Sequence, residues 1–212
     1  MRMIWMGVLL TLGVAVTASA NDASVTLPRD DTATTVPETR TSEPEYYAPS
    51  ALVPAVGSWE AGLQAAYNFG ITNNAQMVTF FPRIGRVMTI LDGPAPGVVT
   101  FGIEGMFSYI YETSENMELG GGLLLRYRMA FPHVQPYAEL EGGMLYEGLR
   151  HFSLGSNVLF TCQGAVGLQF PVWDQVAVNA GYRFRHISNA GQSVSNPGLN
   201  SNLLIAGLTY AF

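Results

Sequence analysis

The chain has 212 residues, of which 12% are charged and 48% are hydrophobic, and its formal net charge at pH 7 is −6. No nucleic-acid partner is expected from this acidic balance, because nucleic-acid-binding domains carry basic surfaces. Cys162 is the single cysteine, which excludes an intramolecular disulfide.

Residues 1–20 have the layout of a secretory signal peptide. Arg2 precedes an apolar stretch from Met3 to Val16, and the small residues Ala18, Ser19 and Ala20 follow it. We therefore expect a secreted precursor whose mature chain begins near residue 21, with an uncleaved anchor helix as the alternative. No later segment approaches the ~20 unbroken apolar residues of a membrane helix, so any membrane span must be built from strands.

Residues 21–55 are rich in Thr, Pro, Asp and Glu and show no sustained periodicity. Such a composition buries too little apolar surface to fold alone, so we predict a flexible periplasmic leader. A docked plug or a partner-binding arm is the alternative.

Residues 56–212 are predicted to form one β-barrel domain. From residue 58 onward, turn-like clusters separate segments in which large apolar residues alternate with small or polar ones, the pattern of strands. The first segment runs near 58–69 and the third near 97–112. The second, within 75–90, is the least regular, and Pro82 predicts a bulge in it because proline removes a donor from the ladder.

Each of these segments has one apolar and one polar face. In a soluble sandwich the apolar face would be the core, and that alternative stays open. A membrane barrel is favoured by three features: aromatic residues near strand ends, the expected export signal, and a terminal Phe212 on an apolar-alternating strand, which resembles the assembly signal of outer-membrane barrels. The sequence therefore predicts an all-β, eight-stranded antiparallel up-and-down transmembrane β-barrel in the outer membrane.

With the apolar face toward lipid, the polar face lines the lumen. Eight strands leave room only for packed side chains, so charges there should pair with one another instead of lining a pore. Both ends of the chain within the barrel domain are predicted to be periplasmic, which makes 92–97, 131–136 and 171–174 periplasmic turns and 70–75, 112–117, 148–157 and 188–199 external loops. The charges expected in the lumen are Arg126, Arg128, Arg183, Arg185, Glu104, Glu139 and Glu141.

The outer end of the last two strands carries a candidate catalytic triad. Continuing the lipid-facing alternation past Phe184 places His186 and then Ser188 on one outward face, where an imidazole can act as general base toward a hydroxyl. Asn200 has the same parity, and opposite His186 its amide oxygen could accept from the other ring nitrogen. The alternatives are an interfacial histidine and an ordinary polar loop.

The run from His186 to Gly191, followed by Asn196-Pro197-Gly198-Leu199, resembles the lipid A 3-O-deacylases of the PagL type. These are eight-stranded barrels that hydrolyse an ester-linked acyl chain of lipopolysaccharide. The resemblance implies that His186 is the base, that Ser188 is the nucleophile, and that an oxyanion or substrate site includes Asn189, Gly191 and Asn196.

One position departs from that family, whose third triad member is a glutamate where this chain has Asn200. A neutral amide cannot supply the charge-assisted hydrogen bond that stabilises an imidazolium. The pattern also resembles outer-membrane phospholipase A, whose triad is Ser-His-Asn. That enzyme has twelve strands, more than about 155 residues can supply.

The expected function is therefore an outer-membrane serine esterase that removes a 3-O-linked acyl chain from lipid A. Its expected partner is lipopolysaccharide in the outer leaflet, and the chemistry needs no cofactor or metal. The alternatives are an outer-membrane phospholipase and a non-enzymatic structural barrel with a degenerate triad. The sequence leaves both a monomer and a homodimer open.

Overall fold

The computed structural model describes residues 53–69, 76–111, 116–147, 154–193 and 196–212. The predicted signal peptide and nearly all of the predicted leader lie outside the described residues. No helix long and apolar enough to cross a membrane is found in the described part of the chain.

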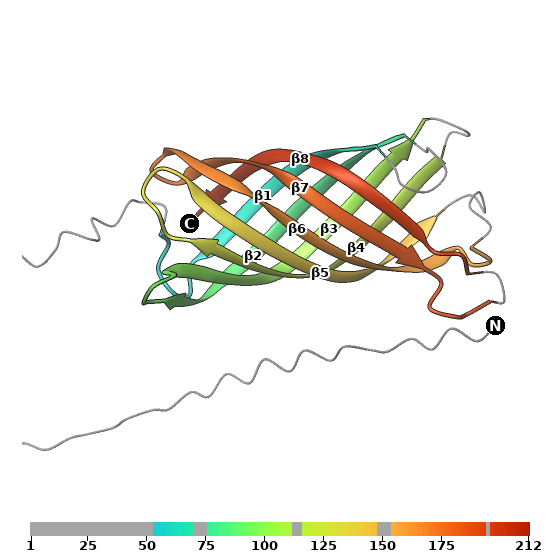
Figure 1. Cartoon of the computed structure of the whole chain (residues 1–212), viewed down its shortest axis with the longest axis horizontal. Coiled ribbons are helices and arrows are strands. Elements are labelled where there is room, and N and C mark those ends of the chain that lie inside the picture. The colour runs from blue at the N-terminus through green and yellow to red at the C-terminus, as the bar shows by residue number, and fades with distance from the viewer. Residues whose placement is uncertain (1–52, 70–75, 112–115, 148–153, 194–195) are drawn as a thin grey trace, which may run out of the picture. The chain divides into compact units, whose positions relative to one another are not determined.

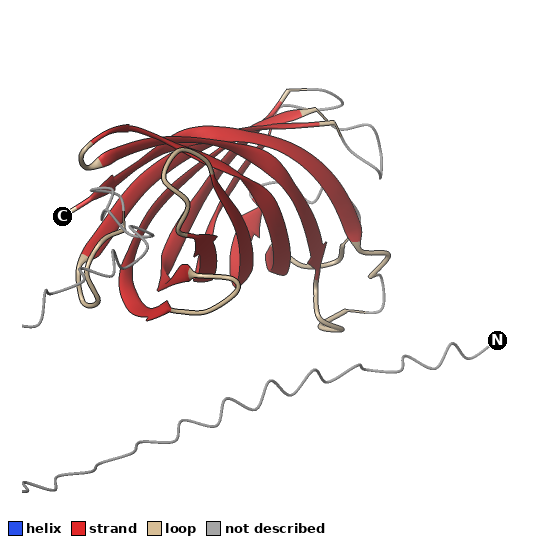
Figure 2. Ribbon diagram, turned by 60° about the vertical axis from the view of Figure 1, so that its left-hand side comes forward, coloured by secondary structure: helices blue, strands red, loops and turns tan. Residues whose placement is uncertain are grey.

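Eight antiparallel strands form a closed barrel in which each strand pairs with the next and the last pairs with the first (Figure 1). The described residues between them form short connections at the two ends of the strands (Figure 2). This architecture confirms the predicted all-β, up-and-down barrel. The strands are β1 (Trp59–Asn68), β2 (Met77–Leu91), β3 (Gly97–Ile110), β4 (Asn116–Met129), β5 (Gln135–Glu147), β6 (Val158–Trp173), β7 (Val176–Ser188) and β8 (Leu199–Ala211).

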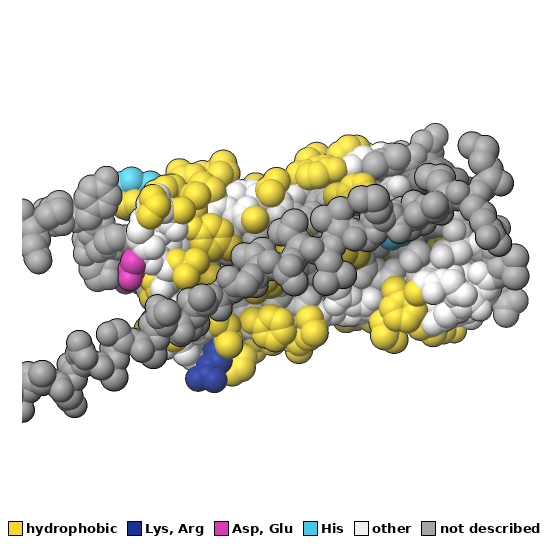
Figure 3. Space-filling model, turned by 60° about the horizontal axis from the view of Figure 1, so that its bottom comes forward, with side chains coloured by type: hydrophobic (Ala, Val, Ile, Leu, Met, Phe, Trp, Pro, Cys, Tyr) yellow, Lys and Arg dark blue, Asp and Glu magenta, His cyan; other side chains and the backbone are white. Residues whose placement is uncertain are grey.

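The strands follow the period-two alternation of the sequence, with the polarity of a soluble protein reversed. In β5, Glu139 and Glu141 point into the barrel and are buried, whereas Leu140 between them is 64% exposed. Leu123 of β4 is 58% exposed in the same way. Hydrophobic side chains accordingly cover much of the described outer surface in Figure 3. An apolar wall around a charged interior is the arrangement of a transmembrane barrel, which rules out the soluble sandwich.

β2 differs from the prediction at Pro82. Pro82 pairs with Leu63 of β1, and the ladder to β3 resumes beyond it in the same register, so the predicted bulge at Pro82 is wrong. The strand runs straight because the proline ring faces Gly105, which has no side chain to obstruct it. The register shift of β2 lies instead between Val87 and Thr89.

Several connections are shorter than predicted, because the strands extend into their ends. β4 begins at Asn116, inside the expected external loop 112–117. β6 continues to Trp173, so the turn expected at 171–174 is reduced to the two residues between β6 and β7.

Ion pairs fill the middle and one end of the lumen, which confirms that the predicted charges pair with one another. Arg183 is nearly fully buried and contacts three carboxylates, Glu104, Glu139 at 3.0 Å and Glu141 at 3.4 Å. Its guanidinium also lies 4.2 Å from the ring centre of Phe81. The other pairs are Arg83 with Glu139 (2.6 Å) and Glu104 (3.8 Å), Arg126 with Glu139 (3.4 Å), Arg128 with Glu60 (2.8 Å) and Arg185 with Glu118 (2.9 Å).

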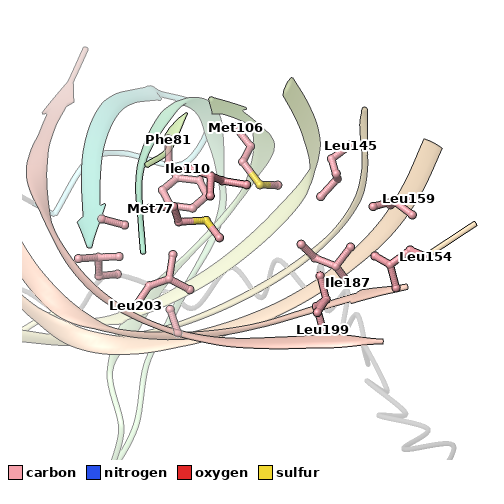
Figure 4. Close-up of a cluster of buried hydrophobic side chains, with 13 residues drawn as sticks. Met77, Phe81, Met106, Ile110, Leu145, Leu154, Leu159, Ile187, Leu199 and Leu203 are labelled. Atoms are coloured by element: carbon pink, nitrogen blue, oxygen red, sulfur yellow. The ribbon is translucent and has the colours of Figure 1, made fainter. Parts of the chain in front are cut away.

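A cluster of apolar side chains gathers inside the curve of the strands toward the end that carries the β7–β8 connection (Figure 4). Ile187 of β7 and Leu199 of β8 belong to this cluster, and Ile187 is almost completely buried. Because successive residues of a strand point to opposite faces, burying Ile187 turns its neighbours His186 and Ser188 outward. The other cluster members are Ala66, Met77, Phe81, Met106, Ile110, Leu145, Leu154, Leu159, Ala165, Leu203 and Ile205.

Replacing Arg183 with methionine should lower the free energy of unfolding by about 3–5 kcal/mol, because it leaves buried carboxylates without their cation. Denaturant titration in lipid vesicles measures this change. Arg86→Gln is the matched control, since Arg86 is exposed and its loss should cost less than about 1 kcal/mol. Equal effects of the two variants would contradict a lumen held by ion pairs.

Candidate active site

His186 and Asn200 face each other across the β7–β8 hairpin. The imidazole Nδ1 lies 2.7 Å from the amide Oδ1 of Asn200. A carbonyl oxygen can only accept a hydrogen bond, so in the neutral ring Nδ1 carries the proton and Nε2 keeps its lone pair. The pair therefore presents an imidazole in the tautomer that a general base requires.

Ser188 is the last residue of β7 and shares the outward face with His186. Both side chains and that of Asn200 are half-buried in the outer wall. Within the described residues, no hydrogen bond joins the Ser188 hydroxyl to the imidazole. Hydrogen bonds between a base and a nucleophile commonly tighten only when the substrate binds. The three side chains thus lie on one outward-facing surface, with the imidazole oriented by Asn200.

Asn189, the next residue, is completely buried and holds the loop that follows β7. Its Nδ2 donates to the carbonyl of Leu154 at 2.6 Å and to the Ser193 hydroxyl at 2.8 Å. Its Oδ1 accepts from the backbone N–H of Gly191 at 2.8 Å. Asn189 and Gly191 are therefore hydrogen-bonded to each other. The bond from Asn189 to Leu154 joins their loop to the neighbouring connection between β5 and β6.

Asn196 lies exposed on the returning arm of this loop. Its Oδ1 accepts from the backbone N–H of Asn189 at 3.0 Å, which leaves the amide NH₂ as the end of this side chain that can donate. The loop also contains Ala190 at φ 50°, a conformation that costs a non-glycine residue free energy. The Asn196 side chain is thereby joined to the residue that follows Ser188.

Gly198 and Cys162 are two neighbours of His186 whose contacts the sequence analysis did not anticipate. Gly198 has φ +68°, and a Cβ there would lie 2.9 Å from Cε1 of His186, so the bare backbone borders the ring. Cys162 of β6 is exposed and lies opposite His186 on the other side. The described residues contain no group of three His, Cys, Asp or Glu side chains that could hold a metal ion.

A family model for the lipid A 3-O-deacylases (PagL) matches residues 91–209, more than half of the chain. The chain belongs to this family. The matched range includes His186, Ser188, Asn196 and Asn200. None of the curated proteins matches the sequence.

Two solved structures share the fold. The crystal structure of the outer membrane enzyme PagL is 20% identical in sequence, with a TM-score of 0.59, and the match covers 69% of this chain and 98% of that one. The crystal structure of Neisserial surface protein A is 15% identical, with a TM-score of 0.52 and coverage of 74% and 98%. At these identities the likeness establishes the barrel architecture.

Gly198→Ala should displace the imidazole of His186, because the added methyl carbon would lie 2.9 Å from Cε1, closer than van der Waals contact allows. We expect the ¹⁵N resonances of His186 to shift while those of His133, in a distant turn, stay unchanged. Gly93→Ala is the control, since Gly93 also has a positive φ but open space around its Cα. A His186 spectrum that is insensitive to Gly198→Ala would contradict the contact.

Proposed function

We propose that this chain is an outer-membrane esterase that removes the 3-O-linked acyl chain of lipid A by serine attack. The observation that carries the proposal is the His186–Asn200 hydrogen bond on the lipid-facing wall, with Ser188 on the same face. Membership of the lipid A 3-O-deacylase family supports the substrate class.

In the proposed mechanism, Nε2 of His186 takes the proton of the Ser188 hydroxyl while Oγ attacks the ester carbonyl carbon. The amide NH₂ of Asn196 donates to the resulting oxyanion. The imidazolium then returns its proton to the departing sugar oxygen, which leaves an acyl-enzyme. Water, deprotonated by the same imidazole, then attacks the acyl-enzyme; the bond from Oγ to the acyl carbon breaks, the imidazolium returns the proton to Oγ, and the fatty acid is released.

Asn200 positions the base throughout this cycle, and Asn189 and Gly191 hold the loop that carries Asn196. Substrate enters laterally from the outer leaflet, because the site lies on the outer wall and the lumen is filled by ion pairs and apolar side chains. This arrangement uses the membrane itself as the source of substrate.

Ser188→Ala should abolish deacylation, with a loss of about 10³-fold or more, because it removes the nucleophile. Mass spectrometry of lipid A from cells that express each variant measures the missing acyl chain. Ser58→Ala, at the opposite end of the barrel, is the matched control and should keep the wild-type profile. Identical lipid A from wild type and Ser188→Ala would indicate a structural barrel.

An outer-membrane phospholipase is the second candidate, and the asparagine at position 200 favours it through the Ser-His-Asn triad of outer-membrane phospholipase A. Purified protein incubated with lipid A and with glycerophospholipids separates the two. Release of a 3-O-acyl chain supports the deacylase, whereas production of lysophospholipid alone supports the phospholipase.

Asn200→Glu should raise the turnover rate about five- to ten-fold, because a carboxylate stabilises the imidazolium better than a neutral amide does. Single-turnover assays on purified lipid A measure this rate. Asn202→Glu is the control for an added carboxylate on the same face of β8, since residue 202 lies opposite Phe184 and not His186. A fall in rate for Asn200→Glu would contradict the assigned role of position 200.

A further inference from the structure

Arg86 of β2 stands apart from the other arginines of the described chain. It is exposed on the outer wall, whereas the rest are buried in the lumen. On the face drawn in Figure 3, basic side chains are confined to one small area bordered by hydrophobic ones. A cation in the apolar wall of a barrel costs about 2–4 kcal/mol at the bilayer midplane and about 0–1 kcal/mol near the interfaces. A polar group of the membrane in contact with Arg86 would lower this cost.

The surroundings of Arg86 are those of a membrane interface. Its register partners are Trp59 of β1 and Phe101 of β3, which are 43% and 44% exposed on the outer wall. Aromatic side chains of this kind gather at the headgroup level of transmembrane barrels. Arg86 thus lies where lipid headgroups meet the hydrocarbon.

The guanidinium is held in place but is not neutralised by the described chain. Nε donates to the carbonyl of Gly57 at 3.1 Å. None of the described carboxylates lies within ion-pair distance of it. The two Nη groups remain to form the bidentate fork that matches the oxygens of a phosphate.

We propose that Arg86, beside Trp59, binds the phosphate group of a glycerophospholipid. Arg86 precedes the β2–β3 turn, at the end of the barrel opposite to His186 and Ser188. The choice of a glycerophospholipid rests on the proposed function, because a deacylase site in the outer leaflet places Arg86 in the periplasmic leaflet. The phosphate contact itself depends only on the geometry of the wall.

Native mass spectrometry of the purified full chain in detergent tests this site. The titrants are phosphatidylglycerol and diacylglycerol with the same acyl chains, which differ by the phosphate headgroup. We expect wild type to bind phosphatidylglycerol about five-fold more tightly than diacylglycerol, the preference that one arginine near an anionic surface provides. Arg86→Gln should remove this preference. Arg86→Lys should keep part of it, because lysine offers a point charge without the fork.

Met88→Gln is the matched control, because it places the same amide on the next outward position of β2 without removing a charge. It should retain the preference. The proposal is overturned if Arg86→Gln retains the preference or if wild type lacks it. Tighter Arg86-dependent binding of lipid A than of phosphatidylglycerol would overturn the choice of phospholipid. Repeating the titration with Ser188→Ala keeps these results independent of any deacylation.

Discussion

The structure depends on one constraint: backbone groups in lipid must all be hydrogen-bonded within the protein, and a strand can meet this only in a closed barrel. In a closed barrel each strand side chain points either to the lipid or into the lumen. In β7 the order is Arg183 in, Phe184 out, Arg185 in and His186 out. A slip of one residue would turn both arginines into the membrane, so their ion pairs with Glu104 and Glu118 fix the register.

That register places the candidate chemistry on the outer wall. The same alternation that buries Ile187 turns His186 and Ser188 toward the lipid, and the β7–β8 ladder brings Asn200 opposite the imidazole. Beyond the end of β7, hydrogen bonds hold the loop between β7 and β8 in place. Asn189 fastens it to the carbonyl of Leu154, and Asn196 fastens the returning arm to Asn189. The barrel sets the position of the base, while the loop sets the position of the proposed oxyanion donor.

The barrel and the outward face shared by His186, Ser188 and Asn200 could be predicted from the sequence because both follow from alternation. The pairing of His186 with Asn200 also requires the register of β7 against β8, which alternation does not give. Features that depend on a second strand could not. Pro82 fits in β2 without a register shift because Gly105 of the neighbouring strand β3 faces it. Cys162 meets His186 only because the β6–β7 ladder shifts register between Pro171 and Trp173, which counting back from the turn cannot reveal.

The proximity of Gly198 to the imidazole could not be predicted from the sequence either. It depends on the path by which the β7–β8 loop returns, with a positive φ at Gly198, and the residue sequence specifies the glycine but not the ring that it borders. Arg86 raises the same difficulty, since its role depends on Gly57 and on aromatic residues of two other strands.

The surface bearing His186 and Ser188 should face lipid, and the single cysteine allows a direct test. Cys162 lies opposite His186 on that surface, while its neighbour Thr161 points into the lumen. A fluorophore on Cys162 of the barrel in lipid vesicles should be quenched strongly by lipids brominated on their acyl chains. Thr161→Cys in a Cys162→Ala background is the control, because a thiol buried in the packed lumen should take up little label. Protection of labelled Cys162 from lipid quenching, with ready labelling and quenching at position 161, would contradict a lipid-facing surface at His186.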